Sequence, residues 1–223
     1  MSILVIAAHP DDEILGCGGA MARHVAEGET VHVLIAAEGA TSRDDRGDTS
    51  ARRTEIEALR DAAISAAKII GAQPPQFCGL PDNRLDELSL LKVAKVIEKT
   101  ISDVQPSIVY THHGGDLNVD HQIIHQATLT ACRPLPGSPV REIYTYEVAS
   151  STEWGSLAFM PQVFVDISPY WNVKRAALDA YASEMRPFPH ARSIEAVEAM
   201  ARVRGGQSGL MAAEAFMLVR AVR

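Results

Sequence analysis

The chain has 223 residues, of which 47% are hydrophobic and 22% charged, a composition typical of a globular protein that excludes the disordered and fibrous classes. It carries 21 Lys and Arg against 28 Asp and Glu, a formal net charge of −7, and this acidic balance argues against a nucleic acid partner. No apolar run approaches the roughly 18 residues of a membrane helix and no secretory signal opens the chain, so we expect no membrane association. The length fits a single domain, residues 1–223.

The first part of the chain alternates between strand and helix patterns. Residues 3–8 form an unbroken apolar run of strand length, and Pro10 ends it. Apolar side chains at steps of three and four residues then predict a helix that ends at Gly28, followed by a second buried strand over residues 31–37. A strand, a helix and a strand with short links form a parallel βαβ unit. The polar segment 38–51 is expected to be a surface loop, either a lid over a site or a plain solvated loop.

This alternation continues to the C-terminus. The further predicted helices cover residues 56–70, 90–101, 119–132, 170–181 and 193–204. The further predicted strands cover residues 76–79, 107–111, 142–148 and 162–167, and the last apolar run, 215–222, fits a strand better than a helix. Repeated strand-then-helix order predicts an α/β fold, a Rossmann-like three-layer sandwich around a mostly parallel central sheet.

Side chains of the kind that bind metals gather where two of these strands end. Residues 8–13 read A-H-P-D-D-E, and residues 111–121 read T-H-H-G-G-D-L-N-V-D-H. Ligands of open parallel sheets bind beyond the carboxyl ends of the strands, so both segments can face one site. First-turn carboxylates that answer the helix dipole would explain the first segment alone, but not the His and Asp residues of the second.

The spacing within the first segment indicates which side chains can share a cation. His9 and Asp12 lie three residues apart across a strand exit and the first turn of a helix, so they can converge on one point. Asp11 must then point elsewhere and stays free beside whatever the cation binds. A third ligand from His121 gives a set of two imidazoles and one carboxylate, which suits Zn²⁺ with an open position for water, and which also accepts Fe²⁺, Co²⁺ or Mn²⁺.

These two segments resemble the LmbE/PIG-L family of zinc-dependent N-deacetylases, which act on N-acetylglucosaminyl and related substrates. The resemblance rests on A-H-P-D-D-E after the first strand and on Asp120-His121. It extends over most of the chain through three weaker motifs, R-R-T-E-I at 52–56, G-L-P-D at 79–82 and A-E-A-F at 213–216. It implies an LmbE-like fold, a small amino-sugar substrate, hydrolysis of its acetamido group to acetate and a free amine, and a homo-oligomer.

The resemblance also implies a role for individual residues. His9, Asp12 and His121 correspond to the zinc ligands, and Asp11 corresponds to the general base that activates the zinc-bound water. Arg52, which is better aligned than Arg53, would contact the substrate. Asp82 would contact sugar hydroxyls.

One position departs from the family pattern. Many members carry a His where this chain has Asn118, and that His supports the oxyanion or protonates the leaving amine. Asn118 can donate a hydrogen bond to the substrate but cannot supply a proton at neutral pH. Either His113 or His190 would take the acid role, with His113 favoured. Asp120 would orient that imidazole or stand behind a zinc ligand.

The leading hypothesis is therefore a zinc-dependent N-deacetylase of an N-acetylglucosamine-type substrate. The alternatives are a metal-dependent hydrolase of another small amide or ester, a non-catalytic zinc-binding module, and a nucleotide-binding Rossmann domain. The run Gly16-Cys17-Gly18-Gly19 lacks the G-x-G-x-x-G spacing that the last of these needs, and close helix packing explains it better. The three cysteines, odd in number and without C-x-x-C spacing, indicate reduced thiols in a cytoplasmic protein.

Overall fold

The computed structural model describes residues 1–43, 50 and 52–223, so half of the polar segment 38–51, the expected surface loop or lid, lies outside the described residues. The strands are β1 (Ser2–Ala7), β2 (Thr30–Ala37), β3 (Gln76–Leu80), β4 (Ile108–His112), β5 (Glu142–Tyr146), β6 (Val163–Asp166) and β7 (Ala213–Ala221). The α-helices are α1 (Asp12–Ala26), α2 (Arg53–Ile70), α3 (Leu90–Val104), α4 (Val119–Ala131), α5 (Trp171–Ala180) and α6 (Ile194–Ser208). Short 3₁₀ turns cover Thr41–Arg43, Leu85–Glu87, Thr152–Trp154 and Ser168–Tyr170.

The strands form one mixed sheet in the order β3-β2-β1-β4-β5-β7-β6. The first five of these strands are parallel, and β7 runs antiparallel to both β5 and β6. The last apolar run is therefore a strand. The predicted α/β sandwich with a mostly parallel sheet is confirmed, and the antiparallel β7 is the feature that the sequence pattern did not predict.

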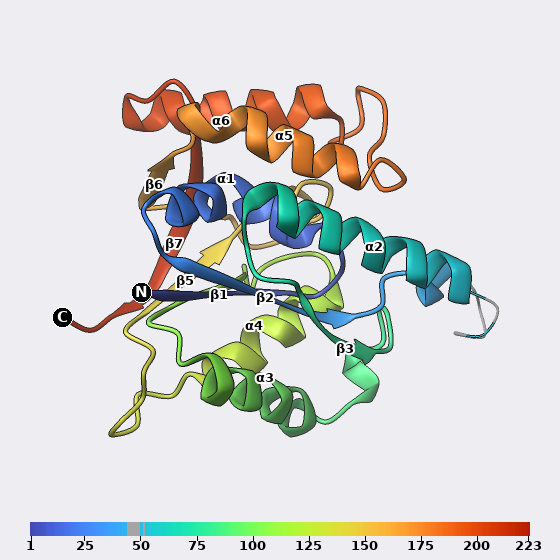
Figure 1. Ribbon diagram of the computed structural model, residues 1–223, viewed down its shortest axis with the longest axis vertical. Coiled ribbons are helices and arrows are strands. Elements are labelled where there is room, and N and C mark those ends of the chain that lie inside the picture. The colour runs from blue at the N-terminus through green and yellow to red at the C-terminus, as the bar shows by residue number, and fades with distance from the viewer. Residues whose placement is uncertain (44–49, 51) are drawn as a thin grey trace.

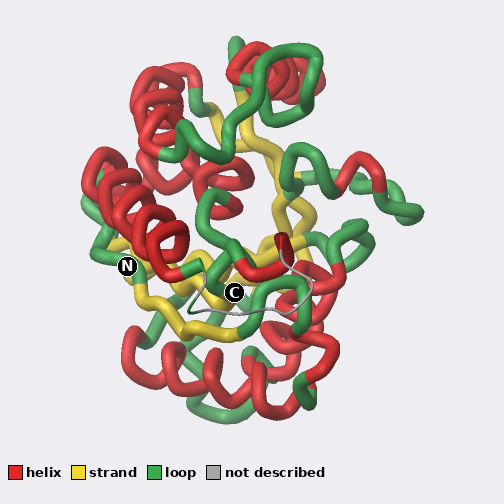
Figure 2. The backbone as a smooth tube through the Cα atoms, turned by 90° about the vertical axis from the view of Figure 1, so that its right-hand side faces the viewer, coloured by secondary structure: helices red, strands yellow, loops and turns green. Residues whose placement is uncertain are grey.

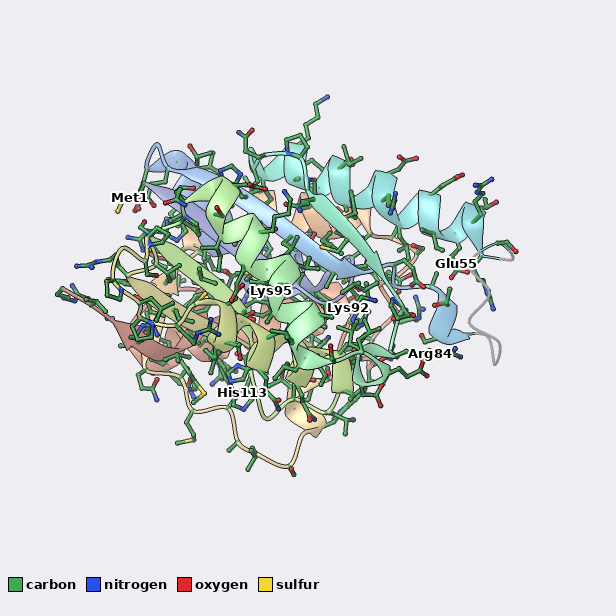
Figure 3. All side chains as sticks on the ribbon, turned by 90° about the horizontal axis from the view of Figure 1, so that it is seen from below. Met1, Glu55, Arg84, Lys92, Lys95 and His113 are labelled. Carbon is green, nitrogen blue, oxygen red and sulfur yellow. The ribbon has the colours of Figure 1, made fainter. Side chains whose placement is uncertain are left out.

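Helices cover both faces of the sheet (Figure 1). Helices α1 and α2 lie on one face with α5 and α6 beyond them, and α3 and α4 lie on the other. Strand β1 alternates between the two cores: Ile3 and Val5 pack toward α1, whereas Leu4 and Ile6 pack toward α3 and α4. Burial on both faces explains why β1 is an unbroken apolar run. Seen from below, α3 crosses its face of the sheet with Lys92 and Lys95 on its outer side (Figure 3).

The order of the strands reverses at β1: β2 and β3 are added to the sheet on one side of it, and β4 pairs with it on the other side. Ligands of α/β sheets bind at such a switch point, in the crevice beyond the carboxyl ends of the strands. Figure 2 turns the right-hand side of Figure 1, where β1 and β2 end, toward the viewer. The segment after β1 and the segment after β4 therefore meet, although about a hundred residues separate them in the sequence.

Helix α1 packs unusually close to the rest of the fold. A Cβ atom at Gly16 would lie 2.2 Å from the ring of Tyr146, and one at Gly19 would lie 2.5 Å from Ile167, so close packing explains the glycines of this run. The helix is broken at Cys17, whose φ and ψ are −144° and 20°. Within the described ranges, none of the helices combines the length and the apolar character needed to span a bilayer.

Candidate metal centre

Asp12 lies between the two imidazoles that the sequence pairs with it. Its Oδ2 atom is 3.3 Å from Nδ1 of His9 and 3.2 Å from Nε2 of His121. In a tetrahedral zinc site with bonds of about 2.0–2.1 Å, neighbouring ligand atoms are about 3.3 Å apart. The two distances fit such a site, and the three residues form a group whose ligand atoms all lie within 4.8 Å of one another.

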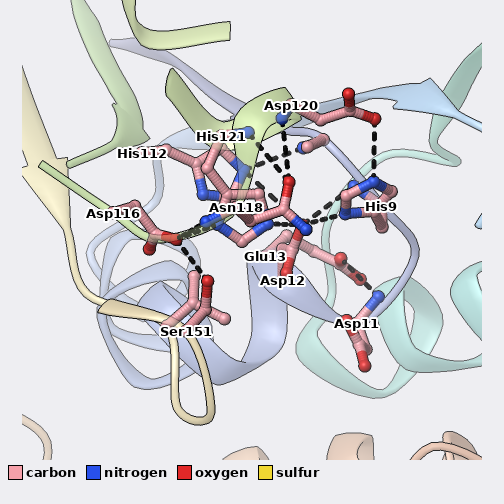
Figure 4. Close-up of polar contacts among 12 residues, drawn as sticks. His9, Asp11, Asp12, Glu13, His112, Asp116, Asn118, Asp120, His121 and Ser151 are labelled. Atoms are coloured by element: carbon pink, nitrogen blue, oxygen red, sulfur yellow. Dashed lines mark hydrogen bonds and ion pairs between the residues drawn. The ribbon is translucent and has the colours of Figure 1, made fainter. Parts of the chain in front are cut away.

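Local backbone contacts place these three side chains. The N–H of His9 donates to Oδ2 of Asp12 at 2.8 Å, so the strand exit and the first turn of α1 are held together. The side chain of Asn118 begins α4, because its Oδ1 atom accepts from the N–H groups of Asp120 and His121 at 2.8 and 3.4 Å. Helix α4 thus starts where its first turn presents His121 to α1 (Figure 4).

A carboxylate stands behind each imidazole. Nε2 of His9, the nitrogen that faces away from Asp12, lies 3.1 Å from Oδ1 of Asp82 and 3.1 Å from Oδ2 of Asp120. Asp120 also accepts from the N–H groups of Asn83 at 2.7 Å and Leu85 at 3.0 Å. Asp120 therefore contacts a proposed ligand from behind, which is one of the two roles expected for it, and Asp82 shares that position.

The corresponding carboxylate for His121 is Asp116, which the sequence analysis did not single out. Its Oδ1 atom lies 3.2 Å from Nδ1 of His121. Asp116 is held by the hydroxyl groups of Ser151 and Thr152 and by the N–H of Asn118. Such outer carboxylates orient an imidazole ligand and make it a better donor to a metal.

His112, which the sequence analysis also missed, packs against His121 with ring centroids 3.9 Å apart. Its Nε2 atom accepts a hydrogen bond from the N–H of Ala8 at 2.8 Å and lies 3.5 Å from Oδ2 of Asp12. Burial lowers the pKa of His112 well below its usual value, so it stays neutral, which fits an acceptor. His112 is the last residue of β4, and its ring stacks on that of His121.

We call His9, Asp12, His112 and His121 the cluster. Several of its buried polar atoms have no hydrogen-bond partner among the described residues: Oδ1 of Asp12, Nδ1 of His112, and Nδ1 and Nε2 of His121. Burial opposes the charged form of His121, but Asp12 and Asp116 raise its pKa to about 9. Burial also opposes charge on Asp12, yet the imidazoles lower its pKa well below the usual value. These surroundings stabilise positive charge, and a divalent cation between His9, Asp12 and His121 would satisfy Oδ1 of Asp12 and Nε2 of His121.

Asp11 points away from this cluster and is held on two sides. Its Oδ2 atom accepts a hydrogen bond from Nη1 of Arg192 at 2.6 Å. Its N–H donates to Oε2 of Glu13 at 3.1 Å, and Oε1 of Glu13 accepts from the hydroxyl of Tyr181 at 2.6 Å. The backbone of Asp11 has φ of 107°, a conformation that is costly for a residue with a side chain. Residues held in such conformations are concentrated at functional sites.

The electrostatics of Asp11 suit proton transfer. Burial raises its pKa to about 7, although the charge of Arg192 acts in the opposite direction. A carboxylate with a pKa near the working pH is well matched to accept and release a proton. Burial likewise raises the pKa of Glu13 to about 8.

The predicted substrate contacts are placed at different points. Asp82 is buried at the cluster, where its Oδ2 atom accepts from the N–H of Ser42 at 2.9 Å. Asn118 lies at the start of α4, and its side-chain NH₂ donates to Oδ1 of Asn83 at 2.9 Å. Arg52 precedes α2 and pairs with Glu55 at 3.0 Å. The structure thus places Asp82 and Asn118 beside the proposed ligands. Arg52 instead forms an ion pair with Glu55 at the start of α2.

The two candidates for the acid role lie apart. The ring of His113 packs edge-on against Phe159 with centroids 5.3 Å apart, and its buried Nε2 atom has no hydrogen-bond partner among the described residues. His190 is exposed, and its Nδ1 atom accepts from the N–H of Arg192 at 3.0 Å. His190 is linked to Asp11 through Arg192. Beside the proposed zinc ligands lies His112, the residue that precedes His113. The acid role of His113 stays a prediction.

The missed residues differ in how visible they are in the sequence. Asp116 and His112 lie inside the second motif segment, and strand alternation could have shown that His112 and His113 point in opposite directions. Arg192 carries no such signal, because it reaches Asp11 from 181 residues further along the chain.

The chain is similar to several known proteins in sequence and in fold. The family model described as GlcNAc-PI de-N-acetylase (PIG-L) matches residues 4–132. An uncharacterized deacetylase of Escherichia coli strain K12, YaiS, is 34% identical over 187 residues, which cover 81% of this chain and 90% of that protein. The 4-oxalmesaconate hydratase of Pseudomonas putida is 30% identical over 201 residues, 82% of this chain and 74% of the hydratase. The solved structure of N,N'-diacetylchitobiose deacetylase from Pyrococcus horikoshii, 19% identical, shares the fold with a TM-score of 0.79 over 98% of this chain and 84% of that one.

Proposed function

The chain belongs to the GlcNAc-PI de-N-acetylase (PIG-L) family. We propose that it is a zinc-dependent N-deacetylase. Its substrate would be an N-acetylglucosamine-type amino-sugar derivative, and its products acetate and a free amine. The observation that carries the proposal is the convergence of His9 Nδ1 and His121 Nε2 on one carboxylate oxygen of Asp12, at 3.3 and 3.2 Å.

His9, Asp12 and His121 would hold the zinc ion. When bound, zinc lowers the pKa of a coordinated water from 15.7 to about 7 and polarises the acetyl carbonyl. Asp11 accepts the proton that the attacking water loses and passes it on. His113 would support the oxyanion or protonate the leaving amine as the C–N bond breaks. General acid–base help of this kind accelerates a reaction by about 10² to 10⁴-fold.

The surrounding carboxylates keep the ligands in place during this reaction. Asp82 and Asp120 lie behind His9, and Asp116 lies behind His121, so each imidazole keeps one nitrogen toward Asp12. Asp82 and Asn118 border the proposed ligands, and there they would meet the hydroxyl groups of the sugar. Arg52 would contact the substrate from the start of α2.

The test separates the proposed ligands from the proposed base. Wild-type protein is assayed for acetate release from a panel of N-acetylglucosamine derivatives, with and without a chelator, and zinc is measured by elemental analysis. We expect Asp11→Asn to keep zinc and lose most turnover, because the amide cannot accept the proton. We expect His121→Ala to lose both. Equal zinc content and equal activity in the two variants would contradict the division of roles.

The hydratase relative supports a second candidate, the metal-assisted addition of water to an unsaturated carboxylic acid. Its 30% identity over 82% of this chain is close to that of the deacetylase YaiS. Both reactions begin with activated water, so the same ligands and base would serve either one. Assaying 4-oxalmesaconate beside the acetylated amino sugars distinguishes them. Turnover of the acid without acetate release from any sugar would replace the proposed activity.

A further inference from the structure

Arg192 reaches Asp11 from a part of the chain that the family model does not match. The matched region ends at residue 132, whereas Arg192 lies between α5 and α6. Its Nη1 atom donates to Oδ2 of Asp11 at 2.6 Å. The Asp11 side chain is 2% exposed and that of Arg192 is 23% exposed, so the pair lies largely out of water. A charged hydrogen bond in such surroundings is short and strongly directional.

The guanidinium group is itself fixed. Its Nε atom donates to Oγ of Ser150 at 2.7 Å, and Nη1 lies 3.9 Å from Oε2 of Glu184. Ser150 belongs to the loop after β5, and its neighbour Ser151 donates to Asp116, the carboxylate behind His121. The loop after β5 therefore holds both Arg192 and Asp116, the carboxylate that contacts His121.

We infer that Arg192 is a positioning residue for Asp11, an inference that rests on the proposed function because it takes Asp11 as the base. The backbone of Asp11 is held through its N–H by Glu13, but its carboxylate turns freely about two bonds unless something fixes it. The hydrogen bond from Arg192 fixes one oxygen and the plane of the carboxylate, so the other oxygen keeps a constant direction for the water proton.

The surroundings argue against a different role, in which Arg192 binds an anionic group of the substrate. Two carboxylates, Asp11 and Glu184, already face its guanidinium group. A guanidinium that is neutralised in this way attracts a further anion weakly. The guanidinium group instead connects Ser150 to Asp11, because it donates one hydrogen bond to each of them.

The experiment compares Arg192→Ala and Arg192→Lys with Arg204→Ala. Arg204 is a matched control because it lies on α6, is 13% exposed and forms an equally short ion pair, 2.6 Å, with Glu147. We expect Arg192→Ala to lower kcat about 10 to 100-fold with KM within about threefold, since a misplaced group costs up to about 10²-fold. Zinc content and thermal stability should match those of Arg204→Ala, which keeps its kcat. Arg192→Lys should recover part of the loss, and millimolar guanidinium should partly restore kcat in Arg192→Ala.

A second readout does not depend on turnover. Crystal structures of wild type and Arg192→Ala should show one Asp11 side-chain conformation in the first and a changed or disordered one in the second. An unchanged Asp11 conformation, a wild-type kcat, or a rise in KM alone would overturn the inference. If wild type releases no acetate from any sugar while Asp11 still moves in Arg192→Ala, the proposed function fails and the positioning stands.

Discussion

The Nδ1 atom of His121 lies 3.2 Å from Oδ1 of Asp116, so a buried carboxylate stands behind a proposed zinc ligand. Replacement by the isosteric amide, Asp116→Asn, removes the charge and can turn an N–H group toward the imidazole. Loss of such an outer partner lowers metal affinity by about 10 to 100-fold, and we expect this effect here. Competition with a chelator of known affinity measures it.

The control for this variant is Asp103→Asn, which removes an exposed carboxylate paired with Lys99 on α3. It should bind zinc as wild type does. A folded Asp116→Asn protein with wild-type affinity would show that Asp116 does not support His121.

The sequence predicted the elements that depend on local patterns. Strand β1 is buried on both faces, so its apolar run was sufficient to identify it, and the spacing of His9 and Asp12 was sufficient to pair them. The insertion of β7 between β5 and β6 was not predicted, because an apolar run does not encode which strand it pairs with. For the same reason Arg192 was missed: its contact with Asp11 depends on how the last two helices return to the sheet.

Removal of the metal should destabilise the protein. Oδ1 of Asp12 and Nε2 of His121 are buried and have no hydrogen-bond partner among the described residues, and a cation that satisfies them binds the folded state only. At a free zinc concentration of 100 times Kd, the stabilisation is about 2.7 kcal/mol, or roughly 5–10 °C in Tm for a chain of this size. Thermal unfolding with added zinc and with a chelator measures the difference. In Asp12→Asn, the difference should disappear; a persistent difference would place the bound zinc elsewhere.

Tyr181 should influence turnover without touching the metal. Its hydroxyl donates to Glu13, and Glu13 accepts from the N–H of Asp11, whose φ of 107° needs support. In Tyr181→Phe this chain of contacts is broken, so we expect kcat to fall several-fold with zinc content unchanged. Tyr144→Phe is the control, because Tyr144 donates to Glu142 in the same way but lies on β5 and contacts neither Asp11 nor Glu13. Equal kcat values for the two variants would remove Glu13 and Tyr181 from the support of the base.

The break in α1 at Cys17 should depend on a buried ion pair. Glu214 accepts from the N–H groups of Gly19 and Ala20 at 2.8 and 2.7 Å, so it begins the second half of the helix. Lys174 donates to Glu214 at 2.6 Å and to the carbonyl of Leu15 at 2.8 Å, on the other side of the break.

Both side chains of this pair, Lys174 and Glu214, are at most 5% exposed, so Lys174→Met leaves a buried carboxylate without its counter-charge. The loss of one partner of such a pair costs about 3–5 kcal/mol of unfolding free energy. Arg202→Met, which breaks the exposed pair with Glu198, should cost under about 1 kcal/mol. Urea unfolding of the zinc-saturated proteins compares the two. If they unfold at the same midpoint, the two backbone N–H groups alone hold Glu214, and the charge of Lys174 is not what stabilises the broken helix.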